Sequence, residues 1–147
     1  MFRVALFVVC MAMSGAVAAA ELTGLWVGYY AYPSGERVPM SMVLQAGEID
    51  FIGEMIEPQT TGESLDVGQR SILAGARKDR VVEFEKAYYK DVVSMEPFRL
   101  REGASVVRYE LMLSGNGNEL FGKWFIGDMS GAASFKRVTP ETVDRLR

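Results

Sequence analysis

A lysine flanked by aromatic residues is the part of this sequence best placed to do chemistry. Lys86 lies between Phe84 and Tyr88, and the two-residue period of a β-strand would place all three side chains on one face. A charged amine on an apolar face costs free energy unless it is paired. Lys86 could therefore bind the carboxylate of a ligand, or form an internal salt bridge with an acid such as Glu54 or Glu110. A β-bulge would instead turn it outward.

Further aromatic side chains fall on the same, inward faces of neighbouring strand-like runs. The candidate ligand-binding residues are Tyr30, Tyr32, Phe84, Lys86, Tyr88, Tyr109 and Trp124. These side chains could line a cup for a small apolar or amphipathic molecule. They could equally fill the interior, because eight strands enclose a space just wide enough for side chains or one small ligand.

The acidic residues predict a solvated face rather than a catalytic or metal site. They alternate along the strand-like runs as Asp50, Glu54, Glu57, Glu83 and Glu85. The sequence shows neither an opposed inward pair for glycoside hydrolysis nor calcium-binding spacing. It has no histidine, and its single cysteine, Cys10, lies in the N-terminal apolar segment. Zinc sites and Ser-His-Asp triads are thereby excluded, and we predict a non-enzymatic protein with no cofactor.

The elements that position these residues are short strands. Eight runs with turn signals between them span Gly24–Tyr32, Val38–Ala46, Ile49–Glu57, Ser71–Ala76, Val81–Tyr89, Ser105–Ser114, Glu119–Ile126 and Gly131–Val138. The Asn116-Gly117 turn is typical of a tight hairpin. The pattern predicts an antiparallel sheet, closed as an eight-stranded up-and-down barrel or folded as a sandwich, and we favour the barrel. Outward charges such as Arg108 and Lys123 count against a membrane barrel.

The two ends of the chain differ from this central domain. Arg3, the apolar run Val4–Met13 and the small residues before Glu21 are typical of a signal peptide, too short to span a membrane. We predict cleavage after residue 20, a barrel over 21–138 and a short C-terminal helix or tail over 139–147. Val9 before Cys10 disfavours lipid attachment at that cysteine. The net charge of −3 argues against nucleic acid as a partner.

Three features of the sequence belong together: Gly24-x-Trp26 in the first strand, the eight strand-like runs, and the basic Lys136-Arg137 in the last strand. In these features the sequence resembles the calycin group of barrels, which comprises lipocalins, fatty-acid-binding proteins and avidin-like proteins. In lipocalins a first-strand tryptophan packs at the closed end beneath a basic residue of the last strand. The resemblance gives Trp26 the first role and Lys136 or Arg137 the second. It also implies a barrel that holds a small molecule.

Two functions follow as expectations. The first is a periplasmic or secreted lipocalin-like protein that binds a small apolar or amphipathic molecule inside the barrel. The alternative is a non-enzymatic envelope accessory or protein-interaction factor with a fully packed barrel. Its partner would bind through the loops 59–70 and 90–103, where Phe98 is flanked by arginines.

Overall fold

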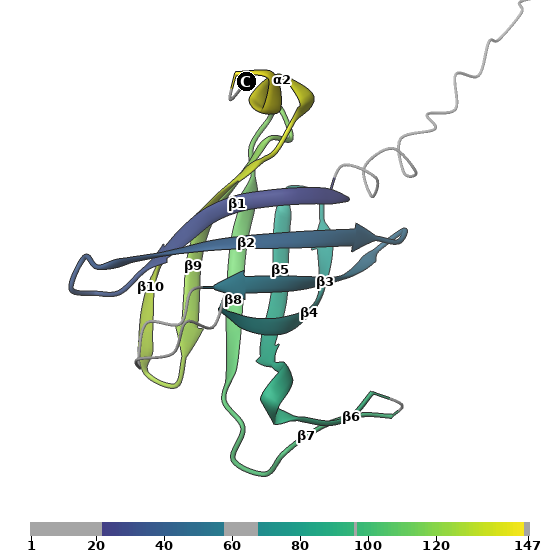
Figure 1. Ribbon diagram of the computed structural model, residues 1–147, viewed down its shortest axis with the longest axis vertical. Helices are drawn as coiled ribbons and strands as arrows, with labels where there is room; N and C mark the ends of the chain where they lie inside the picture. The colour runs from purple at the N-terminus through teal and green to yellow at the C-terminus, as the bar shows by residue number, and fades with distance from the viewer. Residues whose placement is uncertain (1–21, 58–67, 96, 146–147) are drawn as a thin grey trace, which may run out of the picture.

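A closed antiparallel barrel forms the centre of the molecule (Figure 1). The computed structural model describes residues 22–57, 68–95 and 97–145. The barrel strands are β1 (Gly24–Ala31), β2 (Arg37–Ala46), β3 (Asp50–Glu57), β4 (Gln69–Lys78), β5 (Val81–Tyr88), β8 (Val106–Leu113), β9 (Glu119–Ile126) and β10 (Met129–Arg137). They follow one another around the barrel in the order β1-β10-β9-β8-β5-β4-β3-β2. The prediction of an eight-stranded barrel rather than a sandwich is confirmed.

The strands form where side chains alternate between the interior and the outside. In β2 the buried residues are Val38, Met40, Met42 and Leu44, and the residues between them are more exposed. Between β8 and β9, Gly117 has a φ of 73°, a conformation that glycine adopts without the steric cost of a side chain. The alternating pattern therefore fixes the faces of the strands, and the turn fixes the register of the β8–β9 hairpin.

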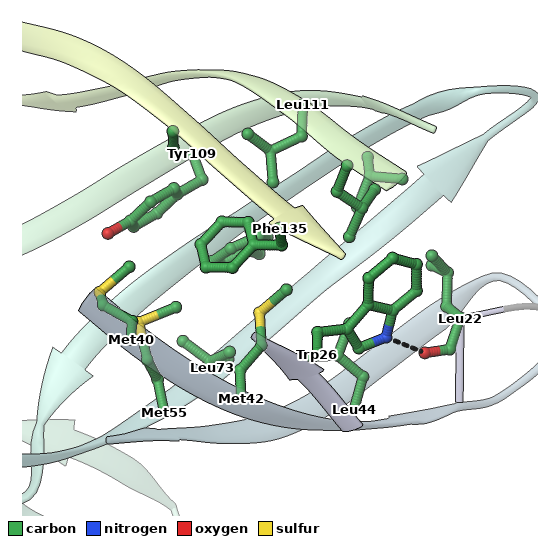
Figure 2. Close-up of a cluster of buried hydrophobic side chains, with 14 of the residues drawn as sticks. Leu22, Trp26, Met40, Met42, Leu44, Met55, Leu73, Tyr109, Leu111 and Phe135 are labelled. Carbon is green, nitrogen blue, oxygen red and sulfur yellow. Dashed lines mark hydrogen bonds between the residues drawn. The ribbon is translucent and has the colours of Figure 1, made fainter. Parts of the chain in front are cut away.

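One end of the barrel is closed by packing around Trp26. Its indole Nε1 donates a hydrogen bond of 3.0 Å to the carbonyl oxygen of Leu22, as Figure 2 shows. The guanidinium carbon of Arg137 lies 4.3 Å from the centroid of the indole ring, and its Nη1 donates to the carbonyl of Thr23 at 2.8 Å. The cation therefore covers the ring and ties β10 to the segment before β1.

A short helix, α2 (Pro140–Asp144), follows β10 near this closed end (Figure 1). Thr139 caps it, because its side chain accepts a hydrogen bond from the backbone N–H of Thr142. This agrees with the predicted C-terminal helix. None of the helices in the described ranges is both long enough and apolar enough to span a membrane.

The segment between β5 and β8 is more ordered than the sequence indicates. We expected irregular chain from Lys90 to Gly103, but it contains the 3-10 helix η1 (Tyr89–Asp91) and the antiparallel strands β6 (Val92–Met95) and β7 (Phe98–Leu100). Figure 1 shows this hairpin extending from the barrel at the end away from α2. An ion pair of 2.5 Å between Asp91 and Arg101 joins its two ends.

The long polar loop predicted from Gln59 to Arg70 is corrected at its C-terminal end. Strand β4 begins at Gln69, and Arg70 pairs across the sheet with Ile56 of β3. The Arg70 guanidinium also forms a salt bridge of 2.9 Å with Glu54 on the outer wall. The remainder of the predicted loop, residues 59–67, lies outside the described residues.

Candidate functional site

Lys86 points into the barrel. Strand β5 pairs regularly with β4 and β8 on either side of Lys86, and the lysine side chain is 2% exposed. The Nζ atom lies 3.2 Å from the carboxylate of Glu57 on β3. The structure thus gives Lys86 an internal salt-bridge partner.

That partner corrects two expectations. Glu57 was expected on a solvated face, but its side chain is only 5% exposed because it continues the inward series of Phe51 and Met55. The acids named as partners for Lys86 lie elsewhere. Glu54 binds Arg70 and the hydroxyl of Tyr89, and Glu110 binds Arg108.

Tyr88, which is half-buried, completes a polar triad with the buried Glu57 and Lys86. Its hydroxyl donates a short hydrogen bond to Oε1 of Glu57 and lies 3.2 Å from Nζ of Lys86. The lysine Nζ also lies 4.6 Å from the centroid of the Tyr88 ring. Burial lowers the pKa of Lys86, and the nearby Glu57 acts in the opposite direction. Burial, then the hydrogen bond to Glu57, raises the pKa of Tyr88.

Three aromatic rings surround the space beside this triad. Tyr30 and Tyr32 each meet Trp124 edge-to-face with ring centroids 5.7 Å apart, and their hydroxyls lie 3.3 Å from each other. Trp124 is fixed by a 2.9 Å hydrogen bond from Nε1 to the carbonyl of Ala31. Gly131 permits this position, because a Cβ there would lie 2.6 Å from the same Nε1.

The rings, together with Lys86 and Tyr88 of the triad, line a cavity of about 120 Å³. Six of the seven predicted ligand-binding residues line it, namely Tyr30, Tyr32, Lys86, Tyr88, Tyr109 and Trp124. Three further lining residues were not among the candidates, Val107, Ile126 and Met129. Alternation along β8 and β9 places Val107 and Ile126 on the inward face, so a signal for both was present.

Two predicted site residues lie away from their expected positions. Phe84 is stacked on Tyr109 with centroids 4.6 Å apart and meets Phe51 edge-to-face, so it belongs to the packed core rather than to the cavity wall. Lys136 is exposed and lies 3.6 Å from Glu119, because it alternates outward in β10. Arg137, not Lys136, is the basic residue over Trp26.

A second hollow lies on the outer wall of the barrel, beneath the β6–β7 hairpin. It has a volume of about 310 Å³, and its lining includes Ile52, Ile72, Phe98 and Val106. Ile52 and Phe98 are both at least half exposed. We name this hollow the outer groove. Its wall is mostly apolar, whereas the outer face of an antiparallel barrel in water is usually polar.

These features define a closed, eight-stranded antiparallel barrel with an aromatic cavity beside a lysine–glutamate–tyrosine triad. No protein-family model and no curated protein matches the sequence. Among solved structures, the chain is similar to a redesigned β-barrel, b11L5F_LGL, with 14% identity and a TM-score of 0.59, covering 88% of this chain and all of that one.

Two further solved structures have a similar fold. The redesigned β-barrel mFAP1 bound to DFHBI is 10% identical with a TM-score of 0.60, and EF1p2_mFAP2b bound to DFHBI is 11% identical with a TM-score of 0.52. Each match covers 85% of this chain and all of the other. At this identity the similarity establishes the fold, in coarse agreement with the calycin-like barrel that the sequence resembles.

Proposed function

We propose that this protein is an exported binding protein that holds a small apolar or amphipathic molecule inside its barrel. The observation that carries the proposal is the cavity of about 120 Å³ lined by Tyr30, Tyr32, Trp124, Lys86 and Tyr88. An apolar wall with a few polar groups is typical of small-molecule sites. The signal-peptide pattern of residues 1–20 supports export.

The size of the cavity limits the ligand. An engineered cavity of about 150 Å³ in another protein holds one benzene, so the space here suits roughly a single ring whose substituent extends toward the opening. Two structurally similar barrels are bound to DFHBI, which supports the use of such an interior for a small molecule.

Native mass spectrometry of residues 21–147, purified after exported expression, tests the proposal directly. We expect a reproducible excess mass that disappears on denaturation, or one that appears after a challenge with small apolar and amphipathic compounds. A bare protein mass under both conditions contradicts ligand binding. An N-terminus other than Glu21 in the exported protein contradicts the predicted cleavage site.

The substitution Val107→Phe is expected to weaken binding of the captured ligand at least about tenfold, because it places a ring inside the cavity. Its matched control is Val106→Phe, one residue earlier on β8, whose side chain lies on the outer wall. Calorimetry on the two variants checks the prediction. Equal loss in both would place the ligand elsewhere or report general unfolding, and thermal melts separate these causes.

A second candidate function is favoured by the outer groove. Phe98 is half exposed beside Arg99 in β7, a pattern that suits a protein partner with an apolar side chain next to acidic residues. Here the two variants exchange roles. Val106→Phe should abolish in-cell crosslinking to such a partner and Val107→Phe should preserve it. Crosslinks that survive in Val106→Phe contradict this candidate.

A further inference from the structure

The hydroxyl of Tyr109 has no hydrogen-bond partner within residues 22–57, 68–95 and 97–145. The residue is 1% exposed, and it lines the cavity. Figure 2 shows its oxygen directed away from the packed cluster around Trp26. A hydroxyl that borders the cavity and has no described partner can bind a ligand atom there.

The other polar groups around the cavity also leave hydrogen-bond donors unused. Lys86 has three N–H donors, of which Glu57 and the Tyr88 oxygen account for two. Tyr88 donates its own proton to Glu57. Tyr30 and Tyr32 share one hydrogen bond, which leaves one of their two O–H groups available. With Tyr109, the described cavity wall therefore presents donors to a ligand that accepts.

The charge of the wall is already balanced. The ammonium of Lys86 and the carboxylate of Glu57 form a pair that is almost completely removed from water. A ligand carboxylate would have to compete with Glu57, which is fixed to β3 and stays beside Lys86. It would also lose its hydration on entry. A neutral acceptor avoids both costs.

We propose that the cavity selects a neutral, single-ring aromatic compound with a carbonyl or similar acceptor, and that Tyr109 is the residue that donates to it. The ring packs against Val107, Ile126 and Trp124, and the acceptor atom receives the Tyr109 proton. This inference rests on the proposed function, because it names the class of ligand for the same cavity. It replaces the ligand carboxylate considered for Lys86 from the sequence.

Three compounds of nearly the same planar shape test the inference: acetophenone with a carbonyl acceptor, α-methylstyrene without one, and the benzoate anion. Each is titrated calorimetrically into the wild-type protein, Tyr109→Phe and the control Tyr29→Phe, whose ring lies beneath Arg37. We expect Tyr109→Phe to weaken acetophenone about fivefold. It should leave α-methylstyrene within about twofold, and Tyr29→Phe should change neither. Benzoate should bind at least about tenfold more weakly than acetophenone.

The other outcomes overturn the inference in separable ways. An equal change for acetophenone and α-methylstyrene, or no change for either, removes the donor role of Tyr109. If benzoate binds more tightly than acetophenone, the cavity does not select a neutral ligand. If none of the three binds while native mass spectrometry yields another ligand, the inference fails and the proposed function stands. If neither experiment yields a ligand, both fail. Because the Tyr109 hydroxyl has no described partner, Tyr109→Phe should melt no lower than wild type.

Discussion

Replacing Lys86 with methionine is expected to lower the free energy of unfolding by about 3 kcal/mol. The substitution keeps most of the side-chain volume but removes the ammonium that balances Glu57. Glu57 is then left in the barrel with Tyr88 as its hydrogen-bond donor. The cost arises from an uncompensated buried charge rather than from the attraction that the pair has lost. Urea unfolding, followed by tryptophan fluorescence, measures it.

The double variant Glu57→Gln/Lys86→Met identifies this cause. Its glutamine can still accept from Tyr88 while neither charge remains, so we expect its stability to lie within about 1 kcal/mol of wild type. The matched control is Lys136→Met, because Lys136 faces Glu119 on the exposed surface. Its cost should stay below about 0.5 kcal/mol. A small effect of Lys86→Met, or a double variant no better than the single one, contradicts the buried pair.

The partner of Lys86 shows what sequence reasoning can and cannot reach. Alternation between Phe84 and Tyr88 was enough to predict an inward lysine, because a strand's period of two leaves two faces to choose from. The same rule separates Glu57 from Glu54, since residues three apart in a strand lie on opposite faces. The signal for a buried Glu57 was therefore present. Which acid meets Lys86 depends on the stagger between strands, which no local pattern specifies.

The stagger between strands also explains why Phe84 does not line the cavity. Facing inward places a side chain in the barrel but does not give its height along the barrel axis. Phe84 of β5 pairs with Tyr109 of β8, and Tyr109 pairs with Trp124 of β9. Along this series of paired residues, Tyr109 and Trp124 line the cavity and Phe84 does not. Phe84 accordingly packs below it against Phe51. The β6–β7 hairpin was missed for a different reason, because strands of four and three residues are too short to show a period.

At alkaline pH the buried tyrosines are expected to destabilise the fold. Burial, and then the charge of Glu57, raises the pKa of Tyr109 far above its ordinary value of 10.0. The folded state keeps this proton while the unfolded state loses it, so stability falls as the pH rises above 10. The loss from Tyr109 is about 1.4 kcal/mol per pH unit. Burial also raises the pKa values of Tyr30 and Tyr88, which act in the same direction.

Lys86 acts with the opposite sign, which determines where the slope should be measured. Burial lowers its pKa in the folded state, so the folded protein gains stability as the pH rises toward the ordinary lysine value of 10.5 and gains nothing more beyond it. Between about pH 11 and pH 12 the tyrosines therefore control the slope. Urea midpoints in this window should fall steeply for wild type, and Tyr109→Phe should reduce the slope by about 1.4 kcal/mol per pH unit. Below about pH 9 the two proteins should respond alike to pH, which makes the variant its own control. Equal slopes in the alkaline window would contradict a raised pKa of Tyr109 in the folded protein.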